Sequence, residues 1–126
     1  MRFMVMVKTD GASEQDASPS ADDIAEMGRY NDELIKAGVL LAGEGLLPSA
    51  KGARVRFTNG TPTVIDGPFT EAKELVAGFW LLDVKSKEEA IEWVKRVPCT
   101  EGVESHIEIR QVLEPEDLIP SATAEA

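Results

Sequence analysis

The sequence predicts a mixed α+β fold in which two helices cover one face of an antiparallel sheet. Two short runs, residues 2–8 and 75–84, are apolar on both faces, which is typical of central strands. Two other segments, residues 20–37 and 86–97, repeat apolar residues at helical spacing. With 126 residues and 43% hydrophobic content, the chain is long enough for one domain with a packed core.

The remaining strands follow from shorter patterns. Residues 39–42 are an apolar strand that leads into a stretch rich in glycine and proline, residues 43–48, where regular structure should end. Residues 106–110 alternate isoleucine with polar side chains, which indicates a strand with one polar face.

The two helices carry recognisable start and stop signals. Ser18 or Ser20 can cap the first helix. The residues that recur at helical spacing, and so predict its inward-facing stripe, are Ile24, Met27, Asn31, Leu34 and Ile35. Ser86 and Glu89 have the spacing of a capping box at the start of the second helix, and Pro98 ends it.

A hairpin is predicted between the two helices. Residues 54–57 and 63–65 read as strands joined by a tight turn at Asn59-Gly60. The resulting order, β-α-β-hairpin-β-α-β, is a ferredoxin-like split βαβ layout with an inserted hairpin.

Two helices can cover only one face of this sheet. The other face would expose either Met4 and Met6 or the set that contains Phe3, Val5 and Val7, a larger apolar patch than a soluble monomer normally carries. A second copy packed sheet on sheet is the simplest cover, so we predict a homodimer.

Charge and targeting signals narrow the class of protein. Thirteen basic residues against 23 acidic ones give a net charge of −10, which argues against a nucleic-acid partner. The acidic residues 114–126 are predicted to be a flexible tail after a domain of residues 1–113. Cys99 is the single cysteine, and no apolar run is long enough for a signal peptide or a membrane span, so we expect a cytoplasmic protein without membrane contact.

One segment resembles a known family. Asp66-Gly67-Pro68-Phe69, followed by Glu71, Lys73 and Glu74, resembles the signature of the DGPF branch of the YCII-related proteins. The resemblance extends upstream to residues 37–46 and downstream to residues 78–93. It implies a ferredoxin-like fold that dimerises as an α+β barrel, with a cleft between sheet and loops.

The resemblance implies little about chemistry. Similar proteins are small enzymes or ligand binders without an established general reaction, often encoded near alternative sigma factors. Some YCII-like relatives place a His in the first helix and an Asp near its end as a proposed acid/base pair. This chain has Met27 or Gly28 and Lys36 near those positions, so that pair is absent.

Asp66 and Lys73 are the candidate catalytic residues. The turn at Gly67-Pro68 would aim the Asp66 carboxylate as a general base, and Lys73 is the nearest cation in sequence. The alternatives are structural: Asp66 can accept amide hydrogen bonds that close its own turn, and Lys73 can be solvated.

Further side chains could bind a ligand. The candidates are Glu44, Arg54, Phe69, Glu71, Glu74 and Trp80. Most of these residues can also be explained without a ligand. Glu44 can stand in a bulge between Gly43 and Gly45, and Arg54 can belong to a solvated face of the hairpin. Glu71 and Glu74 can be surface charges, and Trp80 can pack in the core. His106, the only histidine, reads as a surface residue and excludes a metal site built on several histidines.

These observations support two hypotheses. The first is a homodimer that binds a small anionic or carbonyl-bearing molecule, with proton-transfer chemistry that needs no cofactor or metal. The second is a non-catalytic regulatory module whose acidic surface meets a basic partner linked to transcription.

Overall fold

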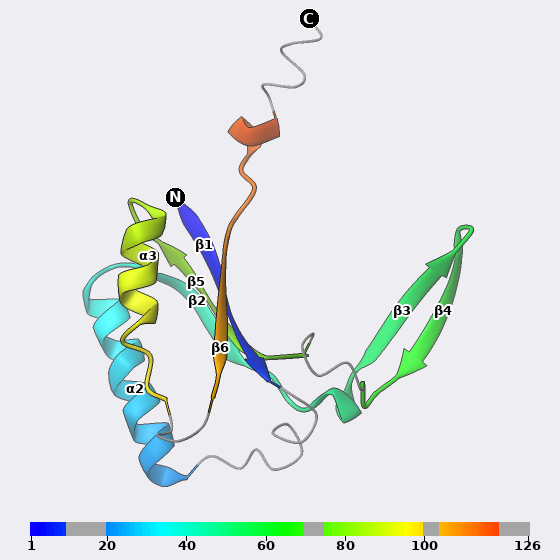
Figure 1. Cartoon of the computed structure of the whole chain (residues 1–126), viewed down its shortest axis with the longest axis horizontal. Coiled ribbons are helices and arrows are strands. Elements are labelled where there is room, and N and C mark those ends of the chain that lie inside the picture. The colour runs from blue at the N-terminus through cyan, green and yellow to red at the C-terminus, as the bar shows by residue number, and fades with distance from the viewer. Residues whose placement is uncertain (10–19, 70–74, 100–103, 119–126) are drawn as a thin grey trace, which may run out of the picture.

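The computed structural model describes residues 1–9, 20–69, 75–99 and 104–118 of the chain. These residues form a mixed α+β fold with two antiparallel sheets (Figure 1). The elements are β1 (Arg2–Thr9), α2 (Ala21–Lys36), β2 (Leu40–Gly45), a 3₁₀ turn (Ser49–Lys51), β3 (Ala53–Thr58), β4 (Thr61–Asp66), β5 (Leu75–Asp83), α3 (Lys87–Val94) and β6 (His106–Gln111). The predicted order of strands and helices is confirmed.

The larger sheet has the strand order β2-β5-β1-β6, and all of its pairings are antiparallel. The two runs predicted to be central, β1 and β5, lie in the middle. Val5 pairs with Trp80 and Phe3 with Leu82, and all four side chains are at most 6% exposed. They point toward the helices and form the centre of the core.

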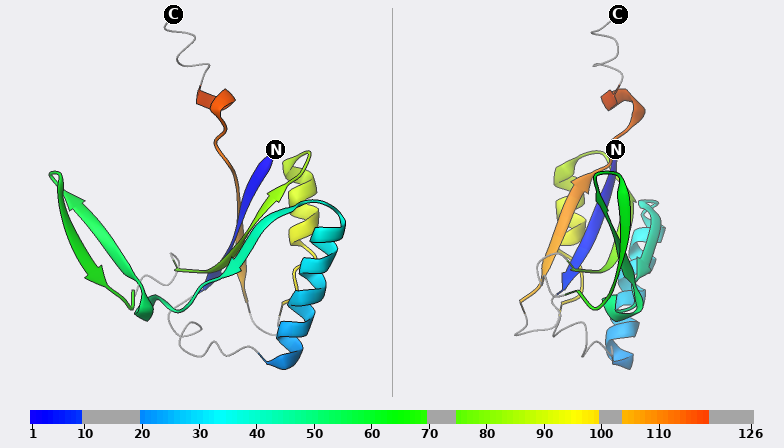
Figure 2. Two further views of the ribbon diagram at one scale, coloured as in Figure 1. Left: turned by 180° about the vertical axis from the view of Figure 1, so that it is seen from behind. Right: turned by 90° about the vertical axis from the view of Figure 1, so that its right-hand side faces the viewer.

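Both long helices lie on one side of this sheet (Figures 1 and 2). The buried side chains of α2 are Tyr30 and Leu34, whereas Ile24 and Ile35 are 60% exposed, so these two members of the predicted stripe are wrong. Tyr30 takes the core position because its ring packs edge-on against Trp80, with centroids 5.6 Å apart.

Of the two predicted helix caps, the one at α2 forms a full capping box and the one at α3 forms only its serine half. Ser20 caps α2 in a full capping box with Asp23. At α3, the Ser86 hydroxyl accepts from the Glu89 N–H, but the Glu89 carboxylate accepts from the N–H of Lys85. The helix ends at Val94 because the last turn tightens before Pro98.

β2 continues through the glycines that were expected to end it. Gly43 stands opposite Trp80, and a Cβ at this position would lie 2.9 Å from the Trp80 Cδ1 atom. The glycine therefore lets the edge strand pass over the indole ring.

We call the side of the larger sheet away from the helices the helix-free face. The cross-strand pairs Met4 with Leu81 and Met6 with Phe79 place their side chains on this face, since neighbouring residues of β1 and β5 point to the helices. All four are half-buried. The helix-free face therefore has an apolar centre.

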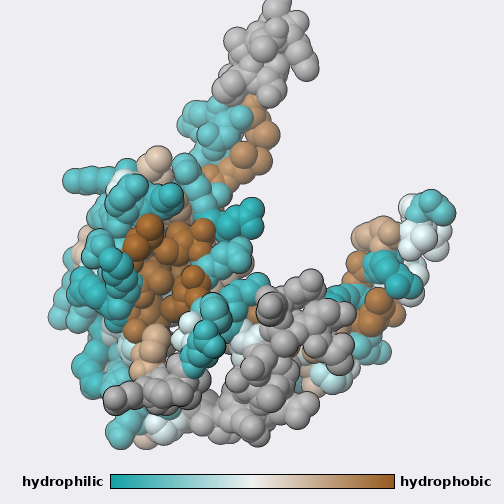
Figure 3. Space-filling model, viewed as in Figure 1, coloured by the Kyte–Doolittle hydropathy of each residue, from teal (hydrophilic) through white to brown (hydrophobic). Residues whose placement is uncertain are grey.

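Apolar side chains are also partly exposed on the helical side of the molecule. Figure 3 shows apolar side chains gathered where Figure 1 draws α3 and β6. The half-buried hydrophobic residues of these elements include Val94, Ile107 and Ile109, which pack against the core.

β3 and β4 form a separate two-stranded hairpin that stands away from the larger sheet, on its helix-free side (Figures 1 and 2). The predicted turn at Asn59-Gly60 is confirmed, because both residues have positive φ, 51° and 81°.

Arg2, at the start of β1, is hydrogen-bonded to Glu114, which follows β6. The Arg2 Nε atom lies 2.6 Å from the Glu114 carboxylate, and this hydrogen bond holds the pKa of Glu114 below its usual range. A helical turn follows at residues 115–118. In the described ranges, no helix is long and apolar enough to cross a membrane.

Candidate functional site

The Asp66-Gly67-Pro68-Phe69 segment lies where β4 ends and the hairpin rejoins the rest of the chain. We call this region, with the 3₁₀ turn at Ser49 and the start of β3, the hairpin root. The Gly67 N–H donates to the Gly52 carbonyl at 3.1 Å, and the Phe69 N–H donates to the Ser49 hydroxyl at 3.1 Å. The segment thus fastens the hairpin at its base.

Gly67 is required by the packing of this root. A Cβ on Gly67 would lie 1.7 Å from the carbonyl oxygen of Ser49, far inside van der Waals contact. The neighbour is backbone and cannot rotate away, so no other residue fits here without moving the turn.

Arg54 and Phe69 are brought together at the root. The Arg54 guanidinium carbon lies 4.0 Å from the centre of the Phe69 ring, and both side chains are half-buried. Such a cation–π contact contributes about 0.5–1 kcal/mol. It fixes the start of β3 against the residue that follows β4.

Asp66 is exposed and takes no part in these contacts. Because it pairs with Ala53, its side chain projects from the hairpin face opposite to Arg54. The Gly67 and Phe69 N–H groups donate to other acceptors and Pro68 has no amide hydrogen, so within the described part of this segment no amide closes a turn on the Asp66 carboxylate. Among the described residues, the Asp66 carboxylate has no hydrogen-bond or ion-pair partner.

Two other predicted site residues, Glu44 and Trp80, belong to the larger sheet. Glu44 is exposed on β2 and pairs with Phe79 on the helix-free face. Trp80 is on the opposite face, 6% exposed, and its indole N–H donates to the Asn31 side-chain oxygen at 2.8 Å. It belongs to the core beneath α2 and not to a surface shared with Asp66. Glu71, Lys73 and Glu74 lie outside the described residues.

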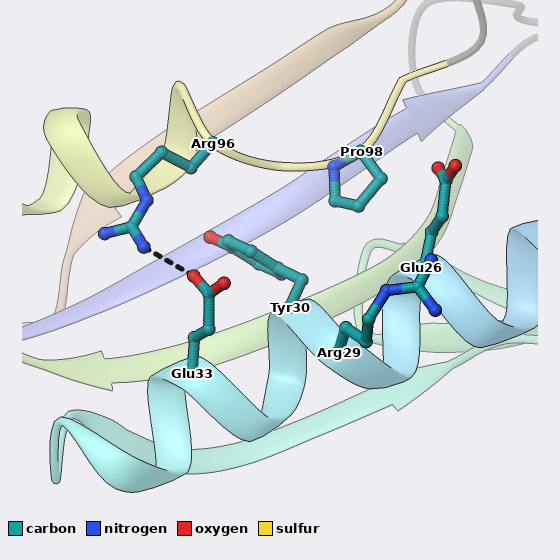
Figure 4. A pocket seen from close by; sticks show the side chains of 6 residues that line it. All are labelled: Glu26, Arg29, Tyr30, Glu33, Arg96 and Pro98. Atoms are coloured by element: carbon teal, nitrogen blue, oxygen red, sulfur yellow. Dashed lines mark hydrogen bonds and ion pairs between the residues drawn. The ribbon is translucent and has the colours of Figure 1, made fainter.

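Sequence reasoning missed a groove on the helical side (Figure 4). Its volume is about 420 Å³, and it is lined by Glu26, Arg29, Tyr30, Glu33, Arg96 and Pro98. Arg96 forms an ion pair with Glu33 and stacks on the Trp93 ring at 4.4 Å. The ion pair between Glu33 of α2 and Arg96 joins the two walls of the groove. The only sequence signal for it is Arg96 directly before Val97-Pro98.

Tyr30 forms the floor of this groove. Its hydroxyl donates to the Trp93 carbonyl at 2.8 Å. Burial raises the pKa of Tyr30 to about 12, because the phenolate would lose its hydration. The neutral phenol is therefore the form that the fold requires.

His106 and Cys99 remain surface residues. The His106 imidazole is 3.5 Å from Glu104 and three-quarters exposed. Cys99 is exposed and its thiol lies 3.5 Å from the Val97 carbonyl. Within the described chain, no group of three or more His, Cys, Asp or Glu side chains could hold a metal ion.

Comparison with known proteins decides the family. A model of the YCII-related domain matches residues 1–115. The chain belongs to the YCII-related family. An uncharacterised protein of Rhizobium meliloti (strain 1021) is 38% identical over 61 residues, which are 48% of this chain and 49% of that protein. The match thus spans about half the length of this curated relative. Of the resemblance seen in the sequence, membership of the YCII-related family is confirmed.

Replacing Gly67 of this YCII-related protein by alanine should destabilise it by about 2 kcal/mol or more, because the new methyl group overlaps the Ser49 carbonyl. Gly52→Ala is the matched control, since its Cβ would meet the same Ser49 oxygen at 3.5 Å, an ordinary contact. Urea unfolding measures both variants. Equal effects of the two substitutions would contradict the packing of the root.

Alkaline titration should show the burial of Tyr30 directly, because it is the only tyrosine. The unfolded chain ionises near 10.0 and the folded chain near 12. The stability that neutral Tyr30 supports is complete below pH 10 and is lost as the pH rises through about 12. Ultraviolet absorbance of the phenolate follows this midpoint, with urea-unfolded protein as the control. A native midpoint equal to the unfolded one would refute the buried phenol.

Proposed function

We propose that this chain is a homodimeric small-molecule-binding protein of the DGPF branch, and that Asp66 is its reactive carboxylate. The fold proposed is the ferredoxin-like split βαβ, with two copies forming an α+β barrel. The observation that carries the proposal is the state of Asp66: it is the one member of its segment with a reactive side chain, and none of the described contacts that fasten the hairpin involve it.

The antiparallel order β2-β5-β1-β6 supports the ferredoxin-like assignment, because the two βαβ units interleave with the hairpin left outside. The half-buried apolar centre of the helix-free face supports the dimer. Met4, Met6, Phe79 and Leu81 are large apolar side chains on a face that the helices do not cover. A second copy would bury them.

The ligand is proposed to be a small hydroxy or oxo acid. Lys73, from its place in the sequence, would meet the acid group, and Asp66 would accept a proton from the adjacent hydroxyl or carbon. Glu44 on the helix-free face, with Glu71 and Glu74 from the sequence, would set the rim of the cleft. Phe69 would be its apolar wall. The proposed chemistry is an isomerisation or elimination without a cofactor, in a cytoplasmic protein.

The alternative is a non-catalytic module that binds a basic protein linked to transcription. The net charge of −10 favours this reading. It predicts that Asp66 can be replaced without loss of small-molecule binding.

A lysine in place of Met6 should dissociate the dimer, because it would bring a charged, strongly hydrated group into the apolar centre of the interface. Ile35→Lys on the exposed side of α2 is the matched control and should leave the dimer intact. Sedimentation velocity over a hundredfold range of protein concentration measures both. A wild-type chain that sediments as a folded monomer at every concentration would remove the dimer from the proposal.

Asp66→Asn should weaken binding of a small hydroxy acid by about tenfold, since an amide oxygen is a poorer acceptor for the ligand hydroxyl than a carboxylate. A panel of such acids is tested by thermal shift and then by titration calorimetry. Asp22→Asn, in the first turn of α2, controls for the loss of one charge. If both variants bind every hit as the wild type does, Asp66 is not the site.

A further inference from the structure

We propose that the β3–β4 hairpin is a clasp that docks onto the second copy of this chain. The inference rests on the homodimer proposed above and adds a second contact surface to it. The hairpin carries an apolar face that nothing in the described chain covers, and a second copy on the helix-free side would be within its reach.

The apolar face of the hairpin follows from its register. Val55 pairs with Val64 and Phe57 with Pro62, so these side chains share one face of the two-stranded ladder. Val55 is 52% exposed, Val64 66% and Phe57 69%. Three large apolar side chains in adjacent positions form a contiguous exposed patch, which is characteristic of an interaction surface.

A two-stranded hairpin is poorly stable in water when nothing packs against it. The root is fastened by the contacts at Gly67, Phe69 and Arg54, but these lie at its base. Beyond the root, the described contacts of β3 and β4 are mainly with each other. Burial of Val55, Val64 and Phe57 against another surface would stabilise the extended arm.

The position of the hairpin favours a second copy of the chain as its occupant. The hairpin and the helix-free face lie on the same side of the molecule, opposite to the helices (Figures 1 and 2). A partner seated on the helix-free face would therefore lie beside the hairpin as well. By twofold symmetry its own hairpin would reach back in the same way.

The helix-free faces alone are smaller than the interface of a typical stable dimer, which supports a second contact through the hairpin. A face of four strands with six to nine residues each measures about 400 Å², so two such faces bury roughly 800 Å². A stable interface typically buries about 1,600 Å². Each hairpin face offers about 200 Å², so two docked arms and the surfaces beneath them would supply about the missing half.

The test replaces the cross-strand pair by Val55→Thr/Val64→Thr, which keeps side-chain shape and strand propensity but removes the apolar contact. The matched control is Thr63→Val, on the other face of the same strand. Analytical ultracentrifugation should show the dimer of the double variant weakened at least tenfold, with the control unchanged. Circular dichroism shows that each variant is folded.

A second variant avoids the question of whether the mutated hairpin folds. Because the Gly67 N–H already bonds to the Gly52 carbonyl, residues 53–66 can be replaced by a short glycine-serine turn. This variant should remain folded and become monomeric at concentrations where the wild type is dimeric.

The outcomes separate the two proposals. A double variant and a deletion variant that both dimerise like the wild type would overturn the clasp and leave the sheet-on-sheet dimer standing. A wild-type chain that is monomeric throughout would overturn both. Loss of the dimer only in Met6→Lys, with hairpin variants unaffected, would likewise assign the interface to the helix-free face alone.

Discussion

A single layer of helices on a sheet with two apolar faces is the constraint on which this structure depends. In β1 and β5, alternate residues belong to different faces, with Phe3 and Val5 beneath the helices and Met4 and Met6 on the other side. The register cannot shift by one residue without exchanging these sets. The helix-free face therefore keeps its apolar character, and every proposal about assembly begins from it.

The sequence predicted those parts of the fold that local chemistry decides. Two-sided apolar runs, the serine caps and the Asn59-Gly60 turn each have a physical cause within a few residues, and each appears where expected. The errors are long-range. Ile24 and Ile35 fit a helical stripe as well as Tyr30 does, but Tyr30 alone can reach the Trp93 carbonyl from the core. No pattern within α2 could show that.

The candidate site was predictable to a similar degree. The pattern around Gly67-Pro68 indicates a stiff turn, yet only the fold shows that the Ser49 backbone occupies the space where a side chain would stand. Alternation on β5 placed Phe79 and Trp80 on opposite faces, but it could not tell which face the helices would cover. The sequence therefore left two interpretations of Trp80 open, ligand binding and core packing, and in the fold Trp80 is a buried residue whose indole N–H donates to Asn31.

The residues of the Asp66-Gly67-Pro68-Phe69 segment differ in their roles at the hairpin root. Gly67 and Phe69 are accounted for by contacts that hold β3 and β4 to the rest of the chain, so their presence does not by itself indicate chemistry. Asp66 has no such role among the described contacts, and it projects from the same hairpin face as Val64. A partner that packs on that face would also change the surroundings of the carboxylate. Assembly and chemistry would then be coupled through one strand, because docking the arm would cover the hairpin face from which Asp66 projects.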